Sequence, residues 1–125
     1  MTASSPESVP APEAAPGHVS THVLDTHRGL PAAEVPVRLD AYDGNAWQTL
    51  AEGTTDADGR WDARRVPAAP GTYRLRFGTG PYFTGIGVPT FYPEVSVIFT
   101  IAVAGQRHHV PLLLSPYGYS TYRGS

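Results

Sequence analysis

The chain has 125 residues, a formal net charge of −2 at pH 7 and no cysteine. This length allows one domain with one modest core, and the missing thiols exclude a disulfide framework, a thiolate metal site and a cysteine nucleophile. The small net charge gives no strong field for nucleic acid or an anionic membrane, so we expect neither as a partner.

The start of the chain differs in composition from the rest. Residues 1–16 are mostly Ala, Pro, Ser and Glu with almost no large apolar side chain, so burial cannot offset the entropy of ordering them. We expect a disordered extension followed by one folded domain over residues 17–125. The chain shows neither the features of a secretory signal nor an apolar stretch long enough to span a membrane. We therefore expect a cytoplasmic protein.

Short alternating segments, separated by Gly, Pro, Asp and Asn, fill the first half of the domain. Residues 18–26 alternate weakly between apolar and polar side chains, and residues 35–42 alternate clearly, so both are predicted strands. The Asp-Gly-Asn cluster at residues 43–45 is typical of a turn. It predicts a hairpin to a third strand over residues 47–51.

The second half continues the same pattern. Residues 72–77 alternate cleanly, and residues 95–103 give the longest strand signal in the chain. The Gly- and Pro-rich stretch between them has room for at most one short helical turn after Pro81, since proline suits the first helical position. A final strand is predicted over residues 107–115. A polar turn over residues 54–59 leads into a further short segment at Arg60 and Trp61, and we count seven or eight strands in all and no long helix. This pattern is typical of an all-β sandwich or barrel.

Few catalytic motifs are present. The sequence has no nucleophile-elbow serine, no Gly-rich phosphate loop and no close carboxylate pair on a recognisable strand. The five histidines are His18, His22, His27, His108 and His109. On one strand His18 and His22 would lie roughly 13 Å apart, too far to share a metal ion, although His22 and His109 could meet across strands. We expect no metal site, and the inventory best permits histidine acting on water with arginine stabilising negative charge.

Taken singly, the candidate residues are ambiguous. A lone strand histidine such as His22 is more often structural, and Arg60, which ends a polar turn, is more often solvated. The adjacent His108 and His109 point to opposite faces of a strand, so at most one can share a pocket with His22. The last four residues, 122–125, would ordinarily be a frayed tail.

Four sequence blocks change this interpretation. They are Ser-Thr-His-Val-Leu-Asp-Thr at residues 20–26, Phe-Tyr-Pro-Glu-Val at 91–95, His-Val-Pro-Leu-Leu-Leu-Ser-Pro at 109–116 and Tyr-Arg-Gly-Ser at 122–125. In this order they resemble the signature segments of the 5-hydroxyisourate hydrolases, and because they run from near the start of the domain to its end, the resemblance covers essentially the whole domain.

The resemblance implies a fold, an assembly and a reaction. The implied fold is a transthyretin-like (prealbumin-like) two-sheet sandwich of about eight strands with at most one short helix. The implied assembly is a homotetramer with active sites in clefts between dimers. The implied reaction is hydrolysis of 5-hydroxyisourate, a cyclic ureide, to 2-oxo-4-hydroxy-4-carboxy-5-ureidoimidazoline in urate degradation, with no cofactor.

In that family two histidines, one arginine and the C-terminal tetrapeptide line the active site. The matching positions are His22, Arg60 and His109 for catalysis and Tyr122, Arg123, Gly124 and Ser125 for substrate binding. The family commonly has His-Tyr-His before the Val-Pro-Leu block, whereas this chain has Arg107, His108 and His109. His109 is therefore the matching histidine, and position 107 has no assigned role. Whether His22 or His109 is the general base stays open.

Two other functions remain as alternatives. A transthyretin-like carrier of small hydrophobic ligands would line its cleft with apolar side chains, whereas this chain offers two histidines and arginines. A noncatalytic β-sandwich module would explain the turn residues at 29–31 and 55–59, but it gives no reason for the His109 block or for the Tyr-Arg-Gly-Ser ending. We favour the enzyme.

Overall fold

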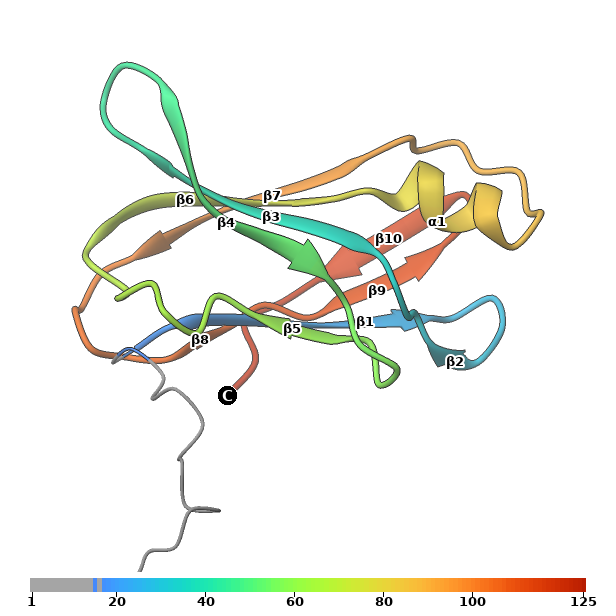
Figure 1. Ribbon diagram of the computed structural model, residues 1–125, viewed down its shortest axis with the longest axis horizontal. Helices are drawn as coiled ribbons and strands as arrows, with labels where there is room; N and C mark the ends of the chain where they lie inside the picture. Colours follow the sequence, from blue (N-terminus) through green and yellow to red (C-terminus); the bar gives the residue numbers. More distant parts are fainter. Residues whose placement is uncertain (1–14, 16) are drawn as a thin grey trace, which may run out of the picture.

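The computed structural model describes residue 15 and residues 17–125. These residues form a sandwich of two sheets with one short helix, α1 (Thr79–Gly85), at one end (Figure 1). The arrangement confirms the expected all-β, transthyretin-like sandwich. Residues 1–14 and 16, on which the expected disordered extension falls, lie outside the described residues. In the described part of the chain, no helix is long and apolar enough to cross a membrane.

The first sheet is built around one central strand, β1 (Val19–Asp25). Antiparallel partners of β1 are β2 (Leu30–Pro31) and β5 (Arg60–Asp62), and its parallel partners are β8 (His108–His109) and β9 (Leu112–Ser115). The last strand, β10 (Gly118–Thr121), pairs with β9. β5 and β8 flank the first half of β1, and β2 and β9 flank its second half.

The second sheet has four antiparallel strands. Their order is β4 (Trp47–Thr54), β3 (Pro36–Tyr42), β6 (Gly71–Phe77) and β7 (Val95–Ile101). The β3–β4 hairpin projects beyond the sandwich, and β7 and β10 each lie at one edge of their sheets (Figure 1).

The core lies between the sheets and follows from the alternation of the strands. Val23, Leu39, Leu75 and Phe77 each point inward and are essentially fully buried. Phe83 of α1 closes the end of the core and is also fully buried. Each such side chain contributes roughly 1.5–3 kcal/mol relative to an exposed position. On β1, polar residues alternate with the buried ones and face outward, so the outer face of the first sheet can carry a site.

Three details differ from the sequence-based expectations. Helix α1 begins at Thr79, so Pro81 takes its third position rather than its first; the first four helical N–H groups have no intrahelical partner, so proline is tolerated there. The final predicted strand, 107–115, is divided into β8 and β9 because Val110 and Pro111 interrupt the pairing, and Pro111 has no N–H to donate. The short strands β2 and β10 were not expected, whereas β5 follows the polar turn at residues 54–59.

Candidate active site

Three of the candidate site residues lie on neighbouring strands of the first sheet, at the end away from α1. His22 on β1 is directly opposite Arg60 on β5, and Ser20 on β1 is directly opposite His109 on β8. Residues two apart on a strand share a face, so Ser20 and His22 point the same way. The outer face of β1 therefore brings His22, Arg60 and His109 together.

The ring of His22 is held by the turn between β4 and β5. Its Nε2 donates a hydrogen bond to the carbonyl oxygen of Asp58 at 2.9 Å. Because a carbonyl can only accept, this bond places the ring hydrogen on Nε2 and leaves Nδ1 of the neutral ring as an acceptor. His22 can therefore accept a proton at Nδ1 without losing the contact that orients it.

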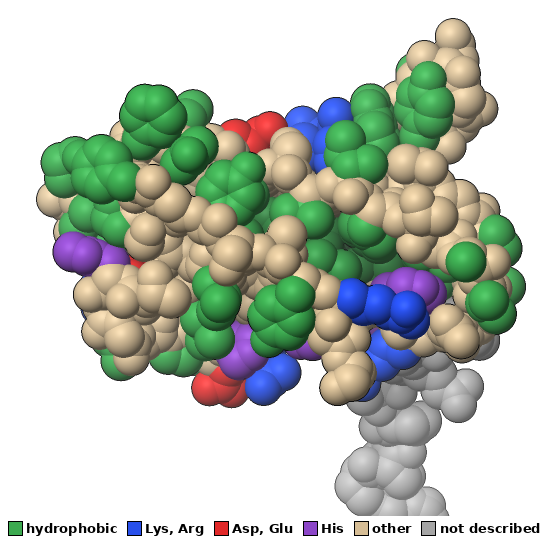
Figure 2. Space-filling model, turned by 180° about the vertical axis from the view of Figure 1, so that it is seen from behind, with side chains coloured by type: hydrophobic (Ala, Val, Ile, Leu, Met, Phe, Trp, Pro, Cys, Tyr) green, Lys and Arg blue, Asp and Glu red, His purple; other side chains and the backbone are tan. Residues whose placement is uncertain are grey.

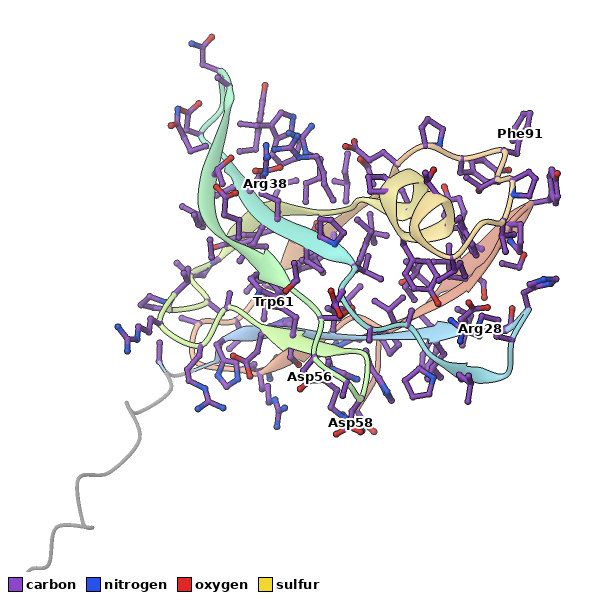
Figure 3. All side chains as sticks on the ribbon, turned by 45° about the vertical axis from the view of Figure 1, so that its right-hand side comes forward. Arg28, Arg38, Asp56, Asp58, Trp61 and Phe91 are labelled. Atoms are coloured by element: carbon purple, nitrogen blue, oxygen red, sulfur yellow. The ribbon has the colours of Figure 1, made fainter. Side chains whose placement is uncertain are left out.

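Two residues shape this turn. The carboxylate of Asp56 accepts hydrogen bonds from the backbone N–H groups of Asp58 and Arg60 at 2.9 and 3.0 Å. Gly59 adopts φ of 76°, a left-handed conformation that favours glycine, and a Cβ there would collide with the carbonyl oxygen of Val23. Figure 3 shows Asp56 and Asp58 in the turn that leads into β5. The polar turn predicted from the sequence thus positions the Asp58 carbonyl that binds His22, and it also places Arg60 at the start of β5.

His109 is fixed from two sides. Its Nδ1 lies 2.9 Å from the hydroxyl oxygen of Ser20. On the other side Gly124 packs against the ring, and a Cβ on Gly124 would lie only 2.6 Å from Cδ2 of His109. The N–H of Gly124 also donates to the carbonyl oxygen of His109 at 2.8 Å. The remaining ring nitrogen, Nε2, is left for a ligand.

The surroundings of His109 favour its neutral form. Burial lowers the pKa of this half-buried imidazole below its usual value of 6.5, and the positive charges of Arg107 and Arg60 and the nearby His22 lower it further. Each of these causes disfavours the protonated ring. These surroundings therefore favour the neutral ring, the form that can accept a proton.

The C-terminal segment follows β10 back to this end of the sandwich, and the end of the chain lies close to β8 (Figure 1). It is not a frayed tail, because Gly124 forms an isolated bridge with His109. Tyr122 is 57% exposed and, with Arg123, borders a hollow of about 220 Å³. Ser125 is exposed. The lining of this hollow is Val97, Ile98, Phe99, Thr100, His108, His109, Val110, Thr121, Tyr122 and Arg123.

A second hollow, of about 310 Å³, is much more polar. Its lining is Ser20, Thr21, Thr54, Asp56, Arg60, Trp61, Asp62, Arg107 and His109. His109 forms part of the wall of both hollows. On the side shown in Figure 2, arginine and histidine side chains lie next to each other beside an apolar surface. The candidate site thus has a polar part and an apolar part on either side of His109.

The two adjacent histidines both line the apolar hollow, but only His109 also lines the polar one, and the structure adds residues that the sequence did not indicate. His108 is buried on the opposite face of β8, with Nδ1 2.8 Å from the carbonyl oxygen of Gln106, so it does not share the polar hollow. Arg107 does line that hollow. Ser20, which binds His109, was also missed; its place two residues before His22 on the same strand face was the available signal.

The arrangement offers acid–base and anion-binding groups. Two imidazoles present a free nitrogen, and the guanidinium groups of Arg60 and Arg107 are the donors best suited to an oxyanion. Among residues 15 and 17–125, no group of three or more His, Cys, Asp or Glu side chains is placed to hold a metal ion.

Comparison with known proteins gives a consistent result. The family model "HIUase/Transthyretin family" matches residues 19–124. A 5-hydroxyisourate hydrolase from Salmonella dublin is 50% identical over 109 residues, covering 86% of this chain and 80% of the relative. The structure of Klebsiella pneumoniae 5-hydroxyisourate hydrolase superposes with a TM-score of 0.77 at 36% identity, covering 87% of this chain and 94% of that one.

Transthyretin from Sparus aurata also superposes, with a TM-score of 0.79 at 29% identity, covering 85% of this chain and 95% of that one. The backbone is thus shared by hydrolases and by a transthyretin, while sequence identity is higher to the hydrolases. On the matched length and the level of identity, the chain belongs to the HIUase/transthyretin family.

Proposed function

We propose that this protein hydrolyses 5-hydroxyisourate to 2-oxo-4-hydroxy-4-carboxy-5-ureidoimidazoline, a step of urate degradation. The observation that carries the proposal is the grouping of His22, Arg60 and His109 on one face of the first sheet, with Gly124 packed against the ring of His109. The proposal is supported by the relatives that share about half of the sequence, which are named as hydrolases of this compound.

The reaction adds water across a ring C–N bond. A neutral imidazole takes a proton from water as the water oxygen bonds to the ring carbonyl carbon, and the C–N bond then breaks. The proton taken from water is passed to the leaving nitrogen with help from the second imidazole, and the carboxylic acid formed by ring opening releases its proton to solvent. The ring nitrogens left available for these transfers are Nδ1 of His22 and Nε2 of His109. No cofactor takes part in the proposed reaction.

Arginine stabilises the charge that develops during the addition. The attacked carbonyl oxygen becomes an oxyanion, and a guanidinium offers it two parallel N–H donors in a planar fork. Arg60 is the proposed donor, since it lies directly opposite His22 in the β1–β5 pair. In the proposal, Tyr122, Arg123, Gly124 and Ser125 bind the substrate as the second wall of the site.

The proposal includes a homotetramer with sites between dimers. Apolar side chains are exposed near the edge strands β7 and β10, where another subunit can cover them; they are Phe91, Ile98, Tyr119 and Tyr122. Light scattering on the purified protein should give the mass of four chains of 13.4 kDa each. A stable, fully active monomer would contradict this part. A cytoplasmic location belongs to the same proposal and is tested by cell fractionation.

The deciding experiment follows freshly generated 5-hydroxyisourate by the loss of its ultraviolet absorbance with and without the protein. We expect strong acceleration by the wild type and by His27→Ala, which changes an exposed histidine in the loop between β1 and β2. We expect almost none from His109→Ala. Binding without acceleration would favour the carrier, and neither binding nor acceleration would favour a noncatalytic module.

A further inference from the structure

We infer that Ser20 is a positioning residue, whose hydroxyl holds the imidazole of His109 in the one orientation that presents Nε2 to the polar hollow. The two residues are 89 positions apart in the chain and meet because β8 pairs in parallel with β1, directly opposite Ser20. The kinetic consequence of this contact rests on the proposed function. The placement of the ring does not.

The environment of Ser20 explains why the hydroxyl matters. Ser20 points to the outer face of the sheet, yet it is only 4% exposed because β5 and β8 flank it on both sides. A polar group buried to this degree needs a hydrogen-bond partner. In the described part of the chain, the Ser20 hydroxyl forms its hydrogen bond with Nδ1 of His109, at 2.9 Å.

The contact selects between two orientations of the ring. A half-turn of the imidazole about its Cβ–Cγ bond exchanges Nδ1 with Cδ2 and Nε2 with Cε1, and such torsions have broad, roughly two-fold preferences. Only one of the two orientations places a nitrogen against the Ser20 hydroxyl. In the other, a carbon would face Ser20 and the free nitrogen would point elsewhere. Ser20 therefore decides which atom of His109 faces the substrate.

Gly124 supports the ring on its opposite edge but does not make this choice. It contacts Cδ2 of His109 through its backbone, which packs against a ring carbon or a ring nitrogen alike. Arg107, Arg60 and His22 lower the pKa of His109, so they act on its protonation rather than on its rotation. Orientation is thus assigned to Ser20 alone.

The hydroxyl also acts on the neutral ring. A neutral imidazole has one N–H and one acceptor nitrogen, and a hydroxyl can donate to Nδ1 or accept from it. Whichever direction the hydrogen bond takes, it favours one tautomer and thereby fixes whether Nε2 gives or takes a proton. Removing the hydroxyl should change both the orientation and the proportion of the two tautomers.

The test uses Ser20→Ala with Ser96→Ala as the matched control. Ser96 is an exposed serine on β7 whose hydroxyl contacts Glu94, so the same atom is removed outside the candidate site. The ¹⁵N shifts of the His109 ring, identified by their loss in His109→Gln, report the tautomer at a pH where the ring is neutral. We expect Ser20→Ala to change these shifts and to lower kcat by roughly tenfold with little change in KM. Ser96→Ala should match the wild type.

Further variants keep the result decisive. Ser20→Thr retains a hydroxyl and should recover most of the kcat that Ser20→Ala loses. Ser20→Cys has nearly the volume of serine and a much weaker hydrogen bond, so it provides the same readout if the alanine variant does not fold. Wild-type ring shifts in a folded Ser20→Ala or Ser20→Cys protein would overturn the inference. Altered shifts with wild-type kcat would overturn the positioning role. If the wild type does not hydrolyse the substrate, the proposed function fails while the ring shifts still decide the orientation.

Discussion

Adding one methyl group to Gly124 tests whether the C-terminal segment positions His109. A Cβ at Gly124 would lie 2.6 Å from Cδ2, 3.3 Å from Cγ and 3.4 Å from Cβ of His109. Carbon atoms in contact are normally about 3.5–4.0 Å apart, so the ring or the segment must move by about 1 Å. A misplacement of about 1 Å in an active site can cost about a hundredfold in rate. We therefore expect Gly124→Ala to lower kcat by about that factor.

The assay is the absorbance decay of 5-hydroxyisourate, with the melting temperature measured in parallel. Gly118→Ala is the matched control, because a Cβ at Gly118, on the strand that leads into the same segment, meets only the Ser115 hydroxyl oxygen at 3.6 Å, an ordinary contact. Neither substitution touches the core, so both proteins should melt close to the wild type. Unchanged turnover in Gly124→Ala would refute the idea that this segment sets the position of His109.

Three further predictions concern the same site. His22→Ala and His109→Ala should each lower the rate at least about a hundredfold, the usual size of an acid–base contribution, and near-normal turnover in either would remove its assigned role. Activity should fall as the pH is lowered, because only a neutral imidazole accepts a proton; burial and neighbouring positive charge lower the pKa of His109, so its part of the decline lies below pH 6.5. A flat profile from about pH 5 to 8 would count against histidine as the base. Deleting residues 122–125, or fusing a tag after Ser125, should reduce turnover strongly, whereas a tag before Met1 should not; equal activity would return the segment to the role of a passive tail.

The long strands were predictable because their own residues encode them. Residues 72–77 and 95–103 alternate over enough positions to define a buried face, and the structure has strands at Gly71–Phe77 and Val95–Ile101. The two- to four-residue strands β2, β5 and β10 carry too little pattern of their own. They are strands because β1 and β9 offer them unpaired backbone groups, and that is a tertiary effect.

The candidate site was predictable by resemblance but not by physics alone. Alternation separated His108 from His109, and the structure has one buried and the other lining the polar hollow. Nothing local indicated that Ser20 and Gly124 would contact the same ring, since both contacts depend on where β8 and the C-terminal segment pack. From sequence alone, a short polar C-terminal segment such as residues 122–125 is expected to be a frayed tail. Only the structure shows the His109 backbone as the partner of Gly124.

The alternation that buries the core also determines which residues form the site. On β1, Val19, Thr21 and Val23 are buried between the sheets, so Ser20 and His22 must face outward. A shift of β1 by one residue would bring His22 into the core and expose Val23, at a cost in both burial and desolvation. The same pairing places β8 beside the first half of β1, on the opposite side from β5. The core therefore fixes the spacing of the two histidines and the arginine, while the contacts from the Asp58 carbonyl, the Ser20 hydroxyl and the Gly124 backbone fix the rings.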